Sequence, residues 1–370
     1  MEAGHGFPLY LLPYVTKSHP NSFLSPLQPR TLCSAPRTCR SHPPRTPHLR
    51  THEYVTLKVY MTGHRQALNE AKVLEGLDCV KSSHPGEVLV RRMREVFEIP
   101  GELGPHTCLV HNPLSITLGD IRNMAGGQLP ESLLKPMVYG LLLALDFLHS
   151  EADLVHTDIQ EGNIMLSITD TSILDEIVDE EQRHPGPRKI DGNRVIYTSM
   201  EMEMPDDPGE PILCDFGDAR IGKGPFQGEV MPDLYRAPEI VLGISWDAMI
   251  DIWNLGLLVW DLFEGKHLFN ERLPSRPESR AAHLAKMVSL LGPPPADLLA
   301  RGSISDKFFD QDGNLKGEQK FNTTLEDEEI VLEGTGKIAF LTFIRNMLRW
   351  RPEDRYTAKE LMKDPWLQDQ

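Results

Sequence analysis

The sequence predicts an α+β protein in which a short β-rich part precedes a longer, mainly helical part. Three early stretches are β-rich or apolar and are interrupted by Gly and Pro, which is typical of strands: 54–60, 88–98 and 107–114. Five stretches carry apolar residues at helical spacing: 64–77, 131–150, 250–264, 337–350 and 357–363. Strands near one end of the chain and helices near the other are typical of an α+β fold.

Composition excludes several classes of protein. The chain has 370 residues, 40% hydrophobic and 25% charged, enough for one large or two modest domains. No uninterrupted apolar run approaches the roughly 18 residues of a membrane span, so we expect no membrane partner. Five cysteines without a C-x-x-C pair indicate neither a disulfide framework nor a zinc site. A reducing compartment, cytoplasmic or nuclear, is the expected location.

Charge divides the chain unevenly. Residues 1–50 carry a net +5, and the whole chain carries −16, which leaves −21 for residues 51–370. Residues 51–370, being acidic, are expected to repel nucleic acid and to favour basic partners. A role of the acidic residues in solubility alone explains this charge equally well. We therefore expect no direct nucleic-acid partner.

Residues 1–50 are rich in Pro, Ser, Thr, Arg and His and show no helical or alternating period. This composition predicts a disordered extension. Its nine prolines argue against the amphipathic helix that an organellar transit peptide requires.

The most informative stretch is residues 154–166, L-V-H-T-D-I-Q-E-G-N-I-M-L, which contains the pattern H-x-D-x-x-x-x-N. In phosphoryl-transfer sites an aspartate so placed accepts the proton of the attacking hydroxyl, and the asparagine five residues later holds a magnesium ion. His156, Asp158 and Asn163 occupy these positions. By itself the pattern also occurs in enzymes that phosphorylate small molecules and, by chance, in solvated loops.

Four further motifs follow the same order as in protein kinases. A strand lysine, Lys58, stands in V-T-L-K; Asp215 begins D-F-G; Glu239 ends A-P-E; and D-x-W-x-x-G begins at Asp251. From about Tyr54 to its C-terminus the chain thus resembles the eukaryotic protein kinases. A-P-E and D-x-W-x-x-G argue against a small-molecule phosphotransferase. Such enzymes lack these two motifs, which belong to the part of the kinase fold that binds protein substrates.

The resemblance implies a bilobal protein-kinase-like fold with a truncated β-rich N-lobe and a mainly helical C-lobe. The expected boundaries are a partial N-lobe and hinge over 51–115 and a C-lobe over 116–370. Two insertions, 167–211 and 265–336, interrupt the C-lobe, and the first, acidic and polar, is expected to be mobile.

The resemblance also assigns roles to individual residues. It implies that Asp158 is the catalytic base, that Lys58 contacts the phosphates of ATP and pairs with Glu70, and that Asn163 and Asp215 hold Mg²⁺. The hinge falls on residues 110–114: Asn112 would offer its carbonyl and Leu114 its N–H to adenine, and Pro113, which has no N–H, falls on the position whose N–H is not needed. Arg355 would pair with Glu239 in a buried, structural contact.

Other details resemble the serine/arginine-rich protein kinase family of the CMGC group, particularly its fungal-type relatives. These are H-T-D in place of H-R-D, the sequence Y-R-A-P-E-I-V-L-G and the insertion before D-F-G. Thr157 cannot bind a phosphate as the usual arginine does, and residues 215–239 contain no Ser or Thr to phosphorylate. The resemblance implies that the substrates are basic, Arg/Ser-rich proteins. The expected state of the protein is a monomer.

Two departures leave alternatives open. Gln160 replaces the lysine expected two residues after the catalytic aspartate, and no G-x-G-x-x-G precedes Lys58, since no glycine lies between Gly6 and Gly63. The chain is accordingly an active serine/threonine kinase, a kinase-fold scaffold without catalysis, or an active kinase whose gene model is mis-assembled at its start.

Overall fold

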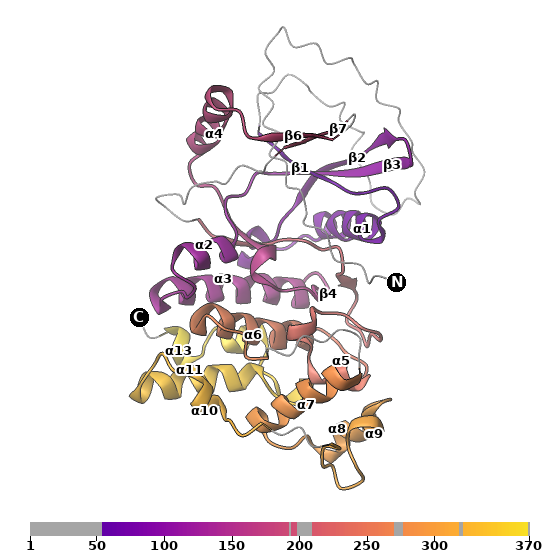
Figure 1. Cartoon of the computed structure of the whole chain (residues 1–370), viewed down its shortest axis with the longest axis vertical. Coiled ribbons are helices and arrows are strands. Elements are labelled where there is room, and N and C mark those ends of the chain that lie inside the picture. The colour runs from indigo at the N-terminus through magenta and orange to yellow at the C-terminus, as the bar shows by residue number, and fades with distance from the viewer. Residues whose placement is uncertain (1–53, 192–193, 198–208, 270–276, 318–320, 369–370) are drawn as a thin grey trace. The chain divides into compact units, whose positions relative to one another are not determined.

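The computed structural model describes residues 54–191, 194–197, 209–269, 277–317 and 321–368 (Figure 1). The predicted disordered extension, residues 1–50, lies outside the described residues, as do parts of both insertions. The described residues form two compact units. Unit 1 comprises residues 54–63, 92–113 and 170–197, and unit 2 comprises 64–91, 114–169 and the described residues from 209 onward.

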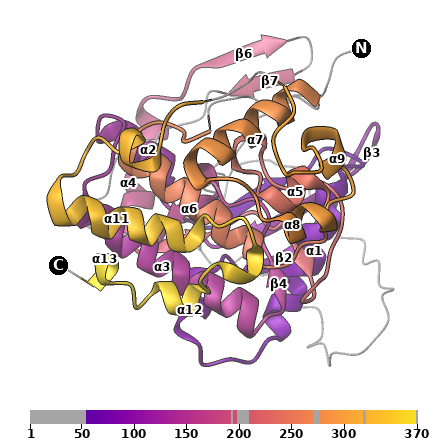
Figure 2. The same ribbon diagram turned by 90° about the horizontal axis from the view of Figure 1, so that it is seen from below.

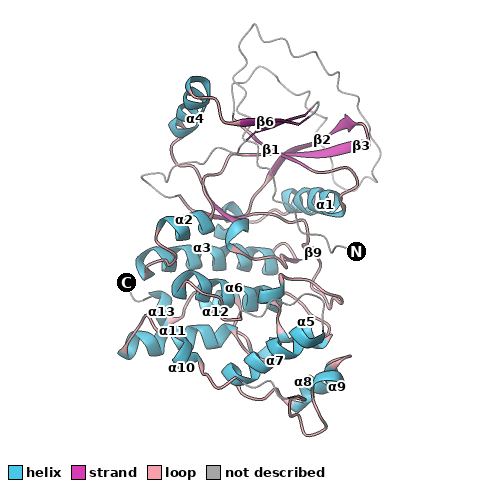
Figure 3. Ribbon diagram, in the orientation of Figure 1, coloured by secondary structure: helices cyan, strands magenta, loops and turns pink. Residues whose placement is uncertain are grey.

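Unit 1 is built on a three-stranded antiparallel sheet, drawn in magenta in Figure 3. Its order is β1 (Thr56–Val59), β3 (Gly104–His111), β2 (Met93–Gly101). Lys58 lies opposite Leu109 in the register of β1 with β3. Successive strand residues face opposite sides of a sheet, and accordingly Lys58 is 8% exposed whereas Val59 is 47% exposed. The pairing therefore places the predicted lysine on the buried side of the sheet.

The first insertion contains regular structure, where the sequence analysis predicts a mobile loop. It forms α4 (Ser172–Arg183) and a strand pair, β6 (Arg188–Asp191) with β7 (Arg194–Tyr197). Apolar residues on one side of α4 are withdrawn from solvent, with Leu174 buried, while its acidic side is exposed. The Tyr54 hydroxyl donates to Asp175 of α4. The spacing of apolar residues within the acidic stretch was thus sufficient to order a helix.

Unit 2 begins with α1 (Arg65–Cys79) and a short 3₁₀ helix, η1 (Pro85–Leu89). The second strand was predicted to start at residue 88, but β2 starts at Met93. Pro85 explains the difference, because its fixed φ suits the first turn of a helix, and the His84 ring nitrogen accepts the Gly86 N–H at 3.0 Å to cap that turn.

The core of unit 2 is α6 (Met249–Glu264), in which every residue from Ile250 onward is buried. A helix that is apolar on all sides needs neighbours on all sides. It packs against α3 (Glu131–Ser150) and α11 (Gly334–Met347), between which it lies in Figure 1. By length and composition α3 could cross a membrane, but 56% of its apolar stretch is buried inside the protein. Its apolar face is a contact surface of the core.

The remaining elements of unit 2 surround this core, and Figure 2 shows them from below. The short strands pair as β4 (Leu154–Val155) with β9 (Arg220–Ile221) and β5 (Ile164–Leu166) with β8 (Pro211–Leu213). The helices are α2 (Leu118–Met124), α5 (Pro238–Leu242), α7 (Pro277–Leu291), α8 (Ala296–Arg301), α9 (Ser305–Phe308), α10 (Leu325–Glu328), α12 (Ala358–Leu361) and α13 (Pro365–Gln368). Three 3₁₀ turns complete the unit: η2 (Glu161–Asn163), η3 (Asp233–Tyr235) and η4 (Pro352–Asp354). The two strand pairs fix the ends of the loops that carry the polar motifs.

Candidate active site

The loop between β4 and β5 carries the H-x-D-x-x-x-x-N motif, and a buried carboxylate of α6 holds its backbone. Asp251 accepts the N–H of His156 on Oδ2 and that of Thr157 on Oδ1, both at 2.8 Å. Thr157 has a φ of 73°, which is uncommon for a β-branched residue and is maintained only where surrounding contacts impose it. Asp251 therefore fixes the loop in a strained conformation.

His156 is fully buried, and its contacts define its role. Its Nδ1 accepts the N–H of Asp158 at 3.2 Å, so the ring proton is on Nε2, which donates to the carbonyl of Cys214 at 3.0 Å. The ring also meets Phe216 edge to face, with centroids 5.0 Å apart. His156 thus links the loop of Asp158 to the D-F-G segment and is structural.

Asp158 is partly buried and is held by two amide side chains. Gln160 Nε2 donates to Asp158 Oδ1 and Oδ2 at 2.9 and 3.0 Å, and Asn163 Nδ2 donates to Oδ2 at 2.8 Å. The pKa of the Asp158 carboxyl is raised above its usual range, chiefly because burial removes water, and the nearby charge of Asp215 adds to the rise. The hydrogen bonds from Gln160 and Asn163 oppose this rise.

Asp215 follows β8 with a φ of 64°, and α1 holds the residues after it. Asn69 Nδ2 donates to the carbonyl of Gly217 at 2.8 Å, and Gln66 Nε2 donates to Asp218 Oδ2 at 2.6 Å. Glu70 is 2% exposed and accepts the N–H of Phe216 on Oε1 at 3.3 Å. One face of α1 thus fixes the direction of the D-F-G segment.

Three predicted nucleotide-binding residues are divided between the units. Lys58 and Asn112 belong to unit 1, and Leu114 belongs to unit 2. Lys58 Nζ lies 5.0 Å from the ring centroid of Tyr60 within unit 1. The pairing of Lys58 with Glu70 and the adenine contacts of Asn112 and Leu114 stay predictions.

A cavity of about 300 Å³ lies beside Asp158, between the catalytic loop and the segment before A-P-E. Its lining comprises Thr157, Asp158, Asp218, Arg220, Glu229, Val230, Met231, Pro232 and Arg236. Thr157 Oγ1 donates to the Asp218 carbonyl at 3.0 Å, so the threonine of the H-T-D motif holds the residue that follows D-F-G. Asp158 is thus one of the polar side chains that line this cavity.

Helix α7 contacts the segment before A-P-E at two points. Arg280 pairs with Glu229, and His283 Nε2 donates to the Arg236 carbonyl at 3.1 Å. Arg236 pairs in turn with Asp233 at 2.9 Å. These contacts hold the segment through side chains of the protein itself.

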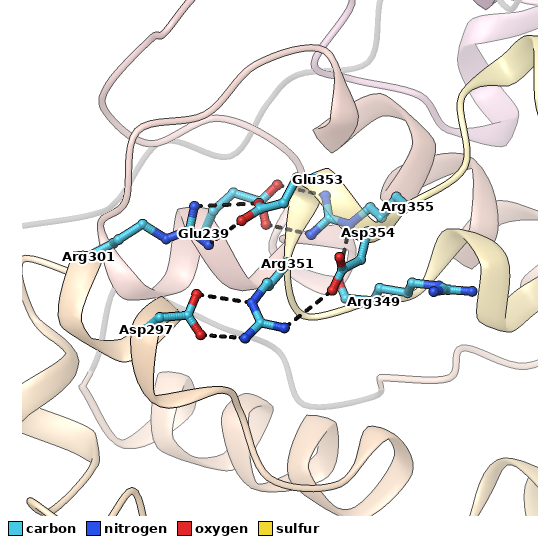
Figure 4. Close-up of polar contacts among 8 residues, drawn as sticks. All are labelled: Glu239, Asp297, Arg301, Arg349, Arg351, Glu353, Asp354 and Arg355. Carbon is cyan, nitrogen blue, oxygen red and sulfur yellow. Dashed lines mark hydrogen bonds and ion pairs between the residues drawn. The ribbon is translucent and has the colours of Figure 1, made fainter.

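The predicted pair of Glu239 and Arg355 is present and fully buried. Two parallel hydrogen bonds of 2.7 Å join the guanidinium to the carboxylate, as Figure 4 shows. Arg355 also donates to the Met249 carbonyl at 2.9 Å. The pair joins the A-P-E motif to the start of α6 and has a structural role.

Several residues that position the site could not be identified from the sequence. The D-x-W-x-x-G motif marked Asp251 but not its bonds to the catalytic loop. The contacts of Gln66, Asn69, Arg280 and His283 had no motif to mark them. They depend on which helix faces are brought to the site, which no local pattern states.

The donor set fits a magnesium ion with bound phosphates. Within the described residues no group of three or more His, Cys, Asp or Glu side chains could hold a metal alone. Asn163 uses its Nδ2 on the carbonyl of Asp158 at 2.9 Å as well as on the carboxylate, so its planar amide directs Oδ1 elsewhere. With Asp215 this offers hard oxygen ligands, and Mg²⁺ commonly takes its other ligands from phosphates and water.

The fold and this site define a protein kinase domain. The protein kinase domain family matches residues 45–367, and the chain belongs to that family. A serine/threonine protein kinase of Aspergillus fumigatus is 44% identical over 324 residues, covering 86% of this chain and 79% of that protein. The Physarum polycephalum serine/threonine-protein kinase SRPK is 28% identical over 308 residues, covering 76% and 71%.

Mouse dual specificity tyrosine-phosphorylation-regulated kinase 3 is 26% identical over 341 residues, covering 85% of this chain and 50% of that protein. Family and relatives together identify the chain as a serine/threonine protein kinase. The predicted fold class is confirmed, with a sheet in the small unit and a helical larger unit. The resemblance to the CMGC group is likewise confirmed.

Proposed function

We propose that this kinase transfers the γ-phosphoryl group of ATP to serine or threonine of basic, Arg/Ser-rich proteins. The observation that carries the proposal is the position of Asp158, bonded to Gln160 and Asn163, at the edge of a cavity near Asp215. A carboxylate there can accept the proton of an incoming hydroxyl.

The ATP side of the site uses the residues that the motifs indicate. Asn163 and Asp215 would hold Mg²⁺, which when bound neutralises phosphate charge. Lys58, positioned by Glu70, would contact the phosphates, and the hinge at Asn112 and Leu114 would bind adenine. Asp158 orients the hydroxyl and takes its proton, and its bonds to the two amides keep the carboxylate in place.

The negative net charge of residues 51–370 gives a physical reason for the preference for basic substrates. Residues 51–370 carry −21, so a cationic peptide is concentrated near the protein. Each exposed charge pair adds only about 0 to 1 kcal/mol, so several arginines must act together.

The test compares an Arg/Ser-repeat peptide with an acidic serine peptide over a salt series, using Asp158→Asn as the inactive control. We expect transfer to the Arg/Ser peptide alone, with kcat/KM falling as salt shortens the roughly 10 Å screening length of 0.1 M. A preference for the acidic peptide, or a basic preference indifferent to salt, would contradict the proposed substrate class. Nucleotide binding without transfer to either peptide would indicate a scaffold.

A further inference from the structure

Two buried glutamates lie together where the end of α6 contacts the turn between α10 and α11, and the proposed phosphoryl transfer uses neither. Glu264, the last residue of α6, is 3% exposed, and Glu329 is 1% exposed. The Glu264 carboxyl lies within hydrogen-bonding reach of the Glu329 carboxyl. Beside them Lys266 Nζ lies 3.6 Å from Glu328 Oε2, so the residues that flank the two glutamates are also in contact. All of these residues belong to unit 2.

Glu329 has the partners that a buried carboxylate needs. Its Oε1 accepts the N–H of Val331 at 2.8 Å and the N–H of Leu332 at 2.6 Å. Its Oε2 lies 3.2 Å from Lys337 Nζ of α11, and the same ammonium donates to the Glu329 carbonyl at 2.6 Å. These contacts hold Glu329 as a charged carboxylate and fix the turn before α11.

Glu264 lacks such partners. Among the described residues, neither of its carboxyl oxygens has a hydrogen-bond partner, and Glu329 Oε2 accepts no hydrogen bond either. The lysines packed around the two glutamates pair with other carboxylates: Lys266 and Lys286 with Glu328, and Lys337 with Glu329. A second negative charge beside Glu329 would therefore be buried and repelled, which is strongly unfavourable.

We propose that Glu264 and Glu329 share one proton, which joins the end of α6 to the turn before α11 and is lost as the pH rises. The Glu264 hydroxyl donates to Glu329 Oε2, so the oxygens without a hydrogen bond gain one. Burial raises the pKa of the Glu264 carboxyl from 4.5 to about 7, and the charge of Glu329 adds to the rise. The nearby N–H of Ile330 and the ammonium of Lys266 oppose it. The proton is therefore bound below neutral pH and released above it.

The turn that this proton holds is connected to α7. Glu328, adjacent to Glu329, pairs with Lys286 of α7. Three residues before Lys286, His283 donates to the carbonyl of Arg236 in the segment before A-P-E. When both glutamates are charged, their repulsion displaces the turn, and the contact of Glu328 with α7 weakens with it. The pair is thus a pH-sensitive contact that keeps α7 in place.

The test compares the wild type with Glu264→Gln by chemical denaturation of the full chain between pH 5 and 8. The glutamine amide donates to Glu329 at every pH and has no proton to lose. Because folding raises the Glu264 pKa, the folded chain binds more protons than the unfolded chain between pH 4.5 and 7, and stability falls as the pH rises. The unfolding equilibrium constant of the wild type should rise, relative to the variant, roughly tenfold per pH unit up to about pH 7. His283 is present in both proteins and cancels in the comparison.

Two further variants control this comparison. Glu333→Gln removes an exposed carboxylate from the same turn and should follow the wild type at every pH. Glu329→Gln removes the neighbouring charge, so it should flatten the pH dependence, and it keeps the test decisive should Glu264→Gln fail to fold. Wild-type and Glu264→Gln curves that stay parallel would overturn the proposal, as would an equally flat curve for Glu333→Gln.

Two measurements detect the proton and the turn directly, and neither requires kinase activity. The infrared spectrum of the wild type at pH 6 should contain the C=O stretching band of a protonated carboxylic acid, and this band should be missing from Glu264→Gln. From pH 6 to pH 8.5, amide protection in residues 325–333 and in α7 should fall at least tenfold in the wild type and stay constant in the variant.

These measurements also distinguish a proton from a metal ion. If no carboxylic acid band differs between the two proteins, or if protection changes equally in both, the shared proton is refuted. Recovery of wild-type protection at pH 8.5 on addition of Ca²⁺, without recovery on return to pH 6, would refute it in favour of a cation held by the two carboxylates. Recovery on return to pH 6 alone supports the proton.

Discussion

Gln160 donates its side-chain amide to both carboxylate oxygens of Asp158, at 2.9 and 3.0 Å. The residue that replaces the expected lysine thus holds the carboxylate that we propose as the catalytic base, but it brings no positive charge. We expect Gln160→Ala to lower kcat by about tenfold or more, because Asp158 loses a positioning contact. Gln160→Lys should exceed the wild type, since an ammonium also stabilises charge on the transferred phosphoryl. A lysine variant slower than the alanine variant in a peptide-transfer assay would refute this role.

Substitution of Asp158 and substitution of Asp215 should have different effects, one on transfer and the other on nucleotide binding. Asp158→Asn is expected to reduce transfer by at least about a thousandfold while nucleotide affinity stays within a few-fold, because the base acts only on the hydroxyl. Asp215→Asn should weaken Mg²⁺-dependent nucleotide binding itself. Calorimetric titration with nucleotide, with and without magnesium, measures both. Full turnover in the Asp158 variant would show that the base is misassigned.

Activity should not require phosphorylation of the segment between Asp215 and Glu239, because Arg280 and His283 of α7 already hold it. Phosphatase treatment is expected to leave the transfer rate to the Arg/Ser peptide unchanged. Arg280→Gln should reduce kcat/KM roughly tenfold, since Glu229 loses its partner. Arg345→Gln, which breaks an exposed pair with Glu326, is the matched control and should change nothing. Silencing by phosphatase, or equal loss in both variants, would contradict the anchoring role.

Figure 4 contains a buried and an exposed bidentate ion pair that can be compared. Arg355 and Glu239 are fully buried, whereas Asp297, which Arg351 contacts, has a side chain 58% exposed. Glu239→Gln leaves a buried guanidinium without its counter-charge and should lower the free energy of unfolding by about 3 to 5 kcal/mol. Asp297→Asn should leave the denaturation midpoint unchanged. Equal midpoints for the two variants would show that the buried pair is not a stabilising contact.

His283 should make the stability fall on acidification. Burial lowers its pKa from the ordinary 6.5 to about 4, and its Nδ1 is buried with no hydrogen-bond partner among the described residues. Between pH 6.5 and 4, His283 therefore binds a proton in the unfolded chain but not in the folded chain. Stability is complete above pH 6.5 and falls as the pH drops toward 4, by about 3 kcal/mol at about 1.4 kcal/mol per pH unit.

The matched variant for this effect is His283→Gln, whose amide can still donate to the Arg236 carbonyl. The difference in unfolding free energy between wild type and variant should shrink steadily as the pH falls from 7 to 4.5, because the variant has no group to protonate there. Curves that stay parallel over this range would mean that His283 does not carry the acid sensitivity.

The motif residues and the main helices could be predicted from local sequence patterns. The apolar spacing of 131–150 gave α3 with its bounds, and that of 250–264 gave α6 to within one residue. The ordered series of motifs identified the kinase family and the Glu239–Arg355 pair. These features are readable because helical periodicity is local and because each chemical step requires a particular side chain at a fixed spacing.

The contacts that hold those residues in place, in contrast, could be seen only once the chain was folded. Nothing adjacent to Asp251 in the chain shows that it accepts the N–H groups of His156 and Thr157, about 95 residues away. The order within the acidic insertion and the contacts of α7 with the segment before A-P-E likewise became visible only in the fold. A contact between distant residues depends on how whole helices pack, because packing sets which face each helix presents, and local spacing carries no information about that.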